Sequence, residues 1–178
     1  TQKNGYFTYP KYWDYSLSKE IKKRFNVVDV IYAANTLTHI ANLKDVFKSI
    51  CNILSENGVL IIEDPSLLEC IKKTSYDQFY NEHIYVFSAL AVKNIINQFG
   101  LELFDIQKIN THGGSLRVYV SQEQDILIDI SVETLLKEEE DFGLRDISTY
   151  LDFGRKVKNL KNTVIENLKI LKRKHPII

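Results

Sequence analysis

Two short apolar segments with a helical segment between them decide the fold. Residues 27–34 read VVDVIYAA, and residues 59–63 read VLIIE. Nearly continuous apolar runs of this length are typical of strands that are buried on both faces of a sheet. Between them, Asn42 can cap a helix whose apolar residues recur at helical spacing, and Asn57 and Gly58 can end it. A strand, a helix and a strand joined by short connections predict a βαβ unit, and therefore a parallel sheet of the α/β class.

Helical patterns lie on both sides of this unit. Residues 17–25 read as a short helix, with Ser16 or Ser18 as a possible cap. On the other side, Ser88 can cap a helix over residues 89–99. The first has a basic end, and the second has Leu90, Ile95, Ile96 and Phe99 on its apolar side.

The last part of the sheet is expected to be antiparallel. Residues 101–109 and 115–120 alternate between apolar and polar side chains, and a turn with two glycines joins them. This pattern predicts a hairpin at the end of a mostly parallel sheet. Two helical patterns follow, at about residues 131–142 and 148–173, and the apolar side of the second needs a partner surface.

The composition argues against several classes of protein. The chain has 178 residues, with 23 Lys and Arg against 23 Asp and Glu, so a basic nucleic-acid binder is not expected. No apolar run approaches the roughly 20 residues of a membrane span, and no secretion signal precedes the first helix, so a membrane is not an expected partner. Cys51 and Cys70 stand apart without a C-x-x-C pair. They are expected to be reduced thiols of a cytoplasmic protein rather than a disulfide or a metal site.

Both ends of the sequence resemble interruptions of a longer chain. The sequence contains no methionine, begins in polar residues at Thr1, and ends with residues 176–178, which resemble the start of a strand. No glycine-rich G-x-G loop precedes the first strand, although a cofactor-binding domain of this type carries such a loop. We therefore expect an internal piece of a longer protein, with the glycine-rich loop in a part before Thr1.

Polar residues follow each of the two predicted parallel strands. Residues 35–40 form a polar loop after the first strand, and Asp64 and Pro65 are expected to break the second. Ligands bind beyond the carboxyl ends of the strands in open parallel sheets, so both loops are candidate parts of a site. For His39, a structural role at the entry of the helix and a functional role are equally consistent with the sequence.

The sharpest candidate for chemistry is the stretch Tyr80-Asn81-Glu82-His83. A neutral imidazole accepts a proton near neutral pH, and a neighbouring carboxylate can orient the ring and stabilise its charged form. The tyrosine hydroxyl can donate a hydrogen bond to a developing oxyanion or hold a ligand. The alternative is a hydrogen-bonded polar cluster beneath a loop, without a catalytic role.

Residues 112–117, which read HGGSLR, allow two interpretations. The backbone N–H groups of such a segment can bind an anion. A tight hairpin turn explains the two glycines more simply, and it is the interpretation that the residue types favour.

Three ordered motifs resemble a known enzyme family. Residues 35–40 and 58–65, NTLTHI and GVLIIEDP, resemble the fourth and fifth strands of class I S-adenosylmethionine (SAM)-dependent methyltransferases. Residues 79–88, FYNEHIYVFS, resemble the Y-H-E-H-x-x-Y-F-S signature of the sugar C-methyltransferases, which act on nucleotide-linked keto-deoxysugars. Residues 112–119, HGGSLRVY, resemble the hairpin of the same family. Order and spacing agree from about residue 27 to residue 120.

The resemblance implies a Rossmann-like fold within a longer domain organisation. The family combines a zinc-binding amino-terminal domain, a central SAM-binding domain and a carboxyl-terminal lobe that helps to hold the nucleotide-sugar. Residues 1–122 would form the second half of the SAM-binding domain, and residues 123–178 the helical start of that lobe. A structural zinc ion is then expected only in a preceding domain, no metal ion is expected in this chain, and the chain alone is expected to be inactive.

The resemblance also implies catalytic roles for four residues. His83 would be the general base, with Glu82 as its orienting neighbour. His39 would form a hydrogen bond with a keto or hydroxyl oxygen of the substrate. Tyr80 would position the methyl-bearing end of SAM beside these groups.

Other residues are expected to contact the ligands. Ala34 and Asn35 would lie at the amino-acid or ribose part of SAM. The residues expected to contact the substrate are Asn81, His112, Gly114 and Ser115. Asn81 is a departure from the family, because the signature has a histidine at this position.

The implied activity is the transfer of a methyl group from SAM to a carbon next to the ketone of a nucleotide-linked deoxysugar. That carbon would first lose a proton to the base and become an enolate. Two alternatives remain open. An oxygen or nitrogen methyltransferase would share the sheet but would need no base beside a C–H bond. A non-catalytic remnant would bind a nucleotide-sugar in the same crevice without any proton transfer.

Overall fold

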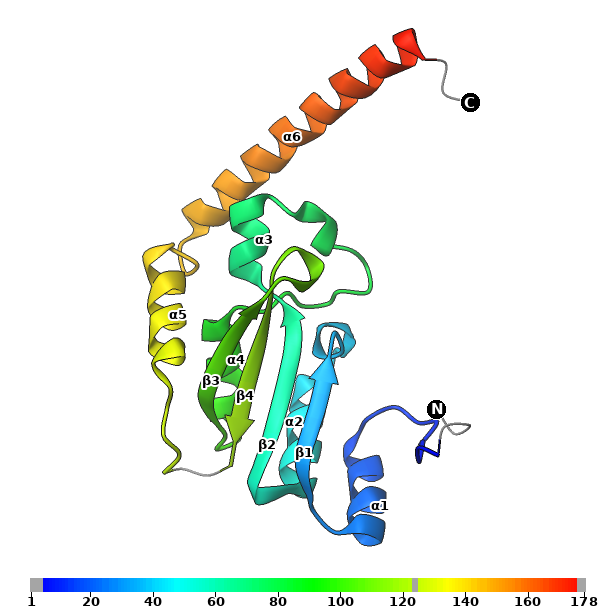
Figure 1. The fold of residues 1–178 in the computed structure, drawn as a ribbon, viewed down its shortest axis with the longest axis vertical. Helices are drawn as coiled ribbons and strands as arrows, with labels where there is room; N and C mark the ends of the chain where they lie inside the picture. The colour runs from blue at the N-terminus through cyan, green and yellow to red at the C-terminus, as the bar shows by residue number, and fades with distance from the viewer. Residues whose placement is uncertain (1–4, 123–124, 176–178) are drawn as a thin grey trace.

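The computed structural model describes residues 5–122 and 125–175, which form one sheet with helices around it (Figure 1). The strands are β1 (Val28–Ala34), β2 (Leu54–Pro65), β3 (Glu102–Ile109) and β4 (Ser115–Ser121). The α-helices are α1 (Tyr15–Phe25), α2 (Leu43–Ile53), α3 (Leu67–Lys73), α4 (Ala89–Asn97), α5 (Ile130–Asp141) and α6 (Ile147–Lys174). The 3-10 helices are η2 (Leu37–His39), η3 (Tyr76–Gln78) and η4 (Thr111–Gly113). The strand expected to start at residues 176–178, and the start of the expected second domain at residue 123, lie outside the described residues.

The sheet confirms the α/β class, the βαβ unit and the hairpin. Its strand order is β1-β2-β4-β3, and β1 pairs in parallel with β2. β4 runs antiparallel to both of its neighbours, β2 and β3. β1, β2 and β3 therefore run in the same direction, and β4 alone among the described strands runs against them, so the sheet is mixed.

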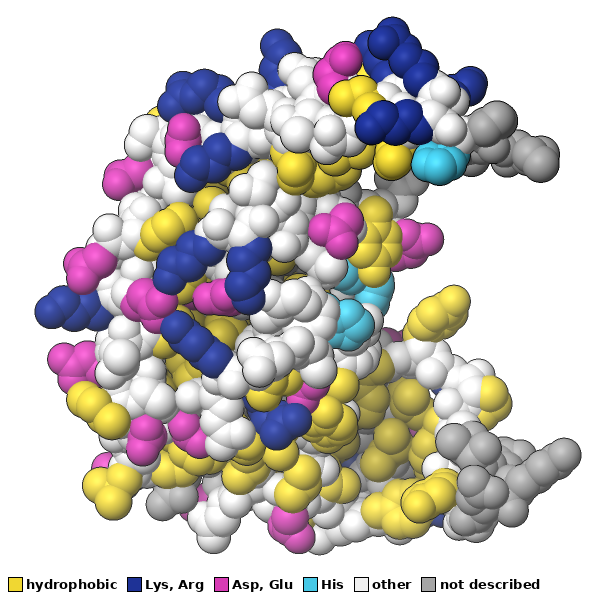
Figure 2. All heavy atoms as spheres, turned by 45° about the horizontal axis from the view of Figure 1, so that its top comes forward, with side chains coloured by type: hydrophobic (Ala, Val, Ile, Leu, Met, Phe, Trp, Pro, Cys, Tyr) yellow, Lys and Arg dark blue, Asp and Glu magenta, His cyan; other side chains and the backbone are white. Residues whose placement is uncertain are grey.

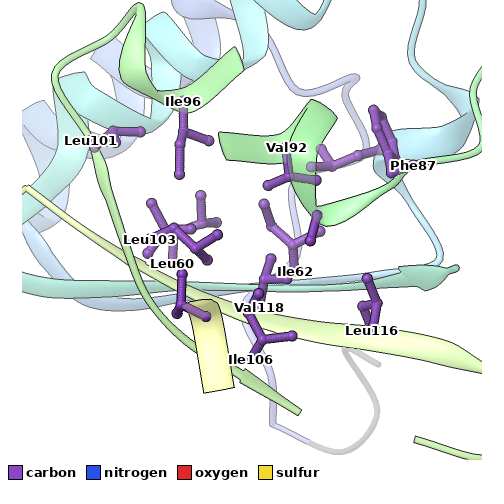
Figure 3. Close-up of a cluster of buried hydrophobic side chains, with 14 of the residues drawn as sticks. Leu60, Ile62, Phe87, Val92, Ile96, Leu101, Leu103, Ile106, Leu116 and Val118 are labelled. Atoms are coloured by element: carbon purple, nitrogen blue, oxygen red, sulfur yellow. The ribbon is translucent and has the colours of Figure 1, made fainter. Parts of the chain in front are cut away.

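One face of the sheet carries the apolar core. Leu60 and Ile62 of β2 and Val118 of β4 point toward Val92 and Ile96 of α4 (Figure 3). α2 contributes its apolar side to the same cluster. Successive side chains of a strand point to opposite faces, so the alternation along β4 and β3 decides which residues enter this core.

The exposure of β1 differs from the sequence prediction. Val30 and Tyr32 are 60% and 58% exposed, whereas Ile31 and Ala33 pack against the core. β1 is the edge strand of the described sheet and has β2 as its neighbour on one side. The prediction that this strand is buried on both faces is therefore wrong for the described chain. An apolar run shows that a segment is suited to burial, but a second covering layer is needed to bury it.

The boundary between α2 and β2 also differs from the prediction. Leu54 follows the last helical residue and already pairs with Val28, so the helix ends before Asn57 and Gly58. Gly58 lies inside β2, where a Cβ atom would lie 2.7 Å from Leu54 Cδ1. Gly58 thus allows the backbone to lie close to the Leu54 side chain. It does not end the helix.

β2 continues through Asp64 and Pro65, which the sequence predicts as a break. Pro65 is the last residue of the strand and lies opposite Ser115 of β4. A proline is compatible with this place because it lies at the end of the strand rather than in its middle. The break therefore occurs after Pro65, at Ser66, which caps α3.

Side chains cap two helices as the sequence predicts. Asn42 and Ser88 cap α2 and α4 through hydrogen bonds from backbone N–H groups. The cap of α1 is Asp14, whose carboxylate accepts a hydrogen bond of 2.7 Å from Leu17 N, so the prediction of a serine cap is wrong. A carboxylate at this position also interacts favourably with the positive end of the helix dipole.

The last helix, α6, extends away from the sheet (Figure 1). None of its residues is fully buried, which agrees with the expectation that its apolar side needs a partner surface. Within residues 5–122 and 125–175, no helix combines the length and the apolar character that a membrane crossing requires.

Candidate functional site

The carboxyl ends of β1 and β2 meet at Asn35. Its backbone N–H donates a hydrogen bond of 2.6 Å to the backbone oxygen of Glu63, near the end of β2. The φ angle of Asn35 is 47°. The hydroxyl of Thr36 donates to Ala34 O at 2.8 Å. These contacts turn the chain sharply into η2, and they leave Ala34 and Asn35 exposed at the end of the strand.

The segment around His83 is held against this turn. The N–H groups of Ile84 and Tyr85 both donate to Thr38 O, at 2.9 and 3.2 Å. The ring of His39 forms a hydrogen bond of 2.8 Å between Nδ1 and Glu82 O. The backbone and one side chain thus join two segments that lie about 45 residues apart in the sequence.

Two histidines and a tyrosine form a compact group at this junction. The Tyr80 hydroxyl and His83 Nε2 are 2.8 Å apart, and His83 Nδ1 lies 2.7 Å from Gln78 O. The ring centroids of His39 and His83 are 4.9 Å apart, and those of Tyr80 and His83 are 4.1 Å apart. In Figure 2, histidine side chains lie next to one another at a hollow in the surface. Three of the four residues expected to be catalytic therefore lie together.

The hydrogen bonds determine which nitrogen of each ring carries the proton. A carbonyl oxygen accepts hydrogen bonds and cannot donate them, so Nδ1 of both His39 and His83 must be the donor. In a neutral ring Nε2 is then an acceptor. Nε2 of His83 accepts from the Tyr80 hydroxyl, while Nε2 of His39 has no hydrogen-bond partner among the described residues. Neutral His39 can consequently accept a hydrogen bond from a hydroxyl group, and it donates to a keto oxygen only when it is protonated.

The structure corrects the expected role of Glu82. The two partners of the His83 ring are Gln78 and Tyr80, and Glu82 is not among them. Glu82 instead provides its backbone oxygen to His39. Neighbours in a turn direct their side chains to different sides, so adjacency in the sequence does not bring this carboxylate to the imidazole. Asn81 is exposed in the same turn.

The glycine turn lies at the same end of the sheet as these groups. Gly114 O accepts a hydrogen bond of 3.1 Å from Ser66 N, directly after β2, and Ser115 starts β4. His112 is exposed, with a φ of 52°. No hydrogen bond or ring contact joins these residues to Tyr80 or His83 within the described chain.

The turn interpretation of the glycines is confirmed. Gly113 and Gly114 have φ values of 82° and 133°, which other residues rarely adopt. A Cβ atom on Gly114 would lie 2.8 Å from Glu69 Cβ. The Gly114 N–H already donates to Thr111 O at 2.8 Å, so this group is occupied within the turn.

Asp64, which the sequence places in a candidate part of the site, is buried in the structure, and the sequence did not predict this burial. It is 5% exposed, and neither carboxyl oxygen has a hydrogen-bond partner among the described residues. Burial raises the pKa of Asp64 to about 7, although nearby groups of Thr36 and Thr38 lower it in part. The signal in the sequence was a carboxylate directly after an apolar strand, where a surface residue would be expected.

A separate charged group lies on the other face of the sheet. Glu63 accepts a hydrogen bond of 3.1 Å from the Tyr32 hydroxyl and forms an ion pair of 2.8 Å with Arg117. The hydrogen bond with Glu63 raises the pKa of Tyr32. Because Glu63 and Asp64 are neighbours in a strand, they point to opposite faces, and Asp64 lies near Thr36 and Thr38 of the segment after β1. In the described ranges, no three histidine, cysteine or acidic side chains are grouped so as to hold a metal ion.

Comparison with family models gives two adjacent matches. Residues 4–106 match a methyltransferase domain, and residues 110–178 match the C-terminal domain of C-methyltransferases. The chain is also 24% identical over 163 residues to the C-methyltransferase NovU of Streptomyces niveus. This alignment covers 91% of the chain and 39% of NovU, so the chain spans well under half the length of this relative.

Two solved structures show a weaker similarity. One is magnesium protoporphyrin IX methyltransferase of Synechocystis PCC 6803, with a TM-score of 0.41 and 13% identity over 53% of this chain and 44% of that one. The other is a SAM-dependent methyltransferase of Anabaena variabilis, with a TM-score of 0.42 and 9% identity over 60% of this chain and 54% of that one. The family rests on the sequence match, which covers more than half of the residues: the chain belongs to the methyltransferase domain family.

Proposed function

We propose that this chain is part of a SAM-dependent C-methyltransferase whose substrate is a nucleotide-linked deoxysugar with a ketone. The observation that carries the proposal is the group of Tyr80, His83 and His39 beyond the carboxyl ends of β1 and β2. This is where open sheets of this kind bind their ligands. The similarity to NovU and to the C-terminal domain of C-methyltransferases supports carbon as the methylated atom.

The end of β1 fits one side of a SAM molecule. Ala34 and Asn35 are exposed there, and the small side chain of Ala34 leaves room for a ligand beside the strand. Asn35 offers an amide that can both donate and accept hydrogen bonds, which suits the amino-acid or ribose part. Tyr80 would lie toward the methyl-bearing end. When bound, SAM supplies an electrophilic methyl group.

His83 and His39 would act in removing the proton from the substrate carbon next to the ketone. A carbon next to a ketone is weakly acidic, and a positioned base accelerates its deprotonation by about 10²–10⁴-fold. His83 is the proposed base, because Gln78 O holds Nδ1–H in place and so stabilises the protonated ring. His39, positioned by Glu82 O, would in its protonated form donate a hydrogen bond from Nε2 to the oxygen of the substrate as negative charge develops on it.

The turn between β3 and β4 would contribute to binding of the sugar or its nucleotide. His112 is exposed there, and Gly114 and Ser115 lie at the carboxyl end of β2, the same end of the sheet as His39 and His83. Asn81 would contact the substrate from the opposite segment, through its amide. Since the Gly114 N–H is occupied within the turn, we expect the His112 ring to make the main polar contact.

The test uses the full-length protein with SAM and dTDP-4-keto-6-deoxyglucose as the probe. We expect transfer of one methyl group to carbon, identified by NMR of the product. In D2O without SAM, we expect deuterium to enter the position next to the ketone. An oxygen or nitrogen methyltransferase would methylate without this exchange, and a non-catalytic binder would retain the sugar without either reaction. Methylation without exchange, or binding without any reaction, would contradict the proposal if it is seen with this probe and with analogues that lack further hydroxyl groups on the sugar.

A further inference from the structure

Both ring nitrogens of His83 are occupied in the structure. Nδ1 donates to Gln78 O at 2.7 Å, and Nε2 accepts from the Tyr80 hydroxyl at 2.8 Å. A neutral imidazole has one lone pair for a proton, and here that lone pair points at Tyr80. A substrate C–H group therefore has no direct access to the basic atom while this hydrogen bond exists.

The Tyr80 oxygen, in contrast, is open to a ligand. The side chain is 45% exposed, and its hydroxyl uses its hydrogen toward His83 but retains lone pairs on oxygen. Its ring lies against the His83 ring, with centroids 4.1 Å apart and planes inclined by 34°. This contact limits rotation of both rings, so the hydroxyl remains directed at Nε2.

We propose that Tyr80 takes the proton from the substrate carbon and passes its own hydroxyl proton to His83, an inference that rests on the proposed C-methyltransferase function. The step is balanced. The C–H bond breaks and a new O–H bond forms on Tyr80, while the former Tyr80 O–H bond breaks and an N–H bond forms at His83 Nε2. The electron pair of the C–H bond remains on the substrate as an enolate, and His83 becomes an imidazolium.

The surroundings of His83 suit the charged ring that this step creates. Both nitrogens of an imidazolium are donors, and both acceptors are already present: Gln78 O at Nδ1 and the tyrosine oxygen at Nε2. No side chain has to move when the proton arrives, which lowers the reorganisation that the step requires. Tyr80 is then a catalytic residue, and Gln78 acts through its backbone as a positioning residue.

His39 provides the internal comparison. Its Nδ1 is held by a backbone carbonyl in the same way, but no tyrosine occupies its Nε2. If direct abstraction by an open imidazole were the route, His39 would be better placed than His83 to perform it. Because His39 also has the proposed role at the substrate oxygen, a loss of exchange in His39→Asn supports direct abstraction only if Tyr80→Phe retains exchange.

The relay predicts a specific isotope effect in the unmodified full-length protein. In D2O the Tyr80 hydroxyl carries deuterium before the reaction, whereas the C–H bond of the substrate still carries hydrogen, so only the relay breaks a bond to deuterium in this step. With dTDP-4-keto-6-deoxyglucose as the probe, we expect loss of the C–H proton to be slower in D2O than in H2O on the pH-independent plateau. An equal rate in both solvents would overturn the relay, and this measurement needs no variant that might misfold.

A set of variants provides the second measurement. We expect Tyr80→Phe to lower both C–H exchange and methyl transfer by about 10²-fold or more. Its SAM affinity should remain within about threefold of the parent. Tyr85→Phe is the matched control, because it also removes one tyrosine hydroxyl from this segment, the one that donates to Ala41 O. This variant should retain exchange of the substrate C–H proton.

The remaining outcomes separate the relay from the proposed function. If Tyr80→Phe retains exchange and only SAM affinity falls, the relay is wrong and His83 or His39 acts directly, with the function intact. If His39→Asn alone abolishes exchange, His39 is the base and the relay is likewise overturned. If the parent protein neither exchanges nor methylates nucleotide-linked ketosugars, the proposed function fails, and the relay fails with it.

Discussion

The carboxyl group of Asp64 is 5% exposed at the end of β2, without a hydrogen-bond partner in the described chain. Burial raises its pKa from an ordinary value of 3.8 to about 7. Below about pH 4, both the folded and the unfolded chain hold the proton. Between about pH 4 and pH 7, the unfolded chain loses it while the folded chain keeps it. The free energy of unfolding therefore decreases as the pH rises through this range, by up to about 4 kcal/mol for three pKa units.

The first prediction concerns this residue. Asp64→Asn has nearly the same shape but no proton to lose, so it should remove most of the decrease between pH 4 and pH 7. We expect the variant to be more stable than the parent at pH 8 and close to it at pH 4, measured by urea denaturation. Asp77→Asn, at an exposed carboxylate of η3, is the control and should leave the pH profile unchanged. A profile for Asp64→Asn as steep as that of the parent would contradict the prediction.

The second prediction concerns His83. Replacing it by asparagine removes the imidazole nitrogen that faces the Tyr80 hydroxyl in the described chain, so methyl transfer by the full-length protein should fall by about 10²–10⁴-fold. SAM binding, followed by calorimetry, should remain close to that of the parent. His175→Asn, at the end of α6 and far along the chain, is the matched control and should keep full activity. Near-normal turnover of His83→Asn would exclude both the base and the relay roles.

At the scale of elements, Glu139 joins two helices. It lies in α5, is fully buried, and accepts hydrogen bonds of 2.9 Å from the N–H groups of Ala89 and Leu90 at the start of α4. The first N–H groups of a helix have no partner within the helix, so a carboxylate from a neighbouring element satisfies them. Burial raises the pKa of Glu139, while these two hydrogen bonds lower it. These contacts hold the N-terminus of α4, which follows the segment that contains His83.

The third prediction tests this joint. Glu139→Ala leaves the buried N–H group of Ala89 and the partly buried N–H group of Leu90 without this partner and should lower the free energy of unfolding by about 1–3 kcal/mol. Glu140→Ala is the adjacent control, because Glu140 is exposed and forms one surface ion pair with Arg145. It should change stability by less than about 1 kcal/mol. Equal effects of the two substitutions in urea denaturation would show that the buried contact is not stabilising.

At the scale of the whole molecule, the described sheet has an open edge at β1. Val30 and Tyr32 are largely exposed, and an uncovered edge strand with apolar side chains favours association with other chains. The long helix α6 adds a second exposed apolar side. The 178-residue chain on its own is therefore expected to self-associate.

The fourth prediction follows from this edge. Val30→Lys places a charge on the open side of β1 and should shift the isolated chain toward monomers, as measured by sedimentation velocity. Leu127→Lys, at an apolar residue that is 90% exposed elsewhere, is the control and should have little effect. If the parent chain is already monomeric at high concentration, or if both variants act alike, the edge does not drive association.

Much of the fold could be predicted from the sequence because its signals are local. The apolar runs of β1 and β2, the caps Asn42 and Ser88 and the alternation of β4 all depend on residues close to one another. The segment of residues 66–88 was harder to predict, because α3 and η3 are short and their polar residues have no clear period. The expected site residues could be named, but their partners could not.

The sequence by itself determined the class of the fold, the glycine turn between β3 and β4, and the presence of two histidines and a tyrosine after the parallel strands. The tertiary structure alone decided that β1 has an open face, that Asp64 is buried, and that His83 is held by Tyr80 and Gln78 rather than by Glu82. The physical reason is that hydrophobic periodicity and helix caps depend on residues that are close together in the sequence. Burial, proton position and hydrogen-bond partners depend on which distant segments fold against one another.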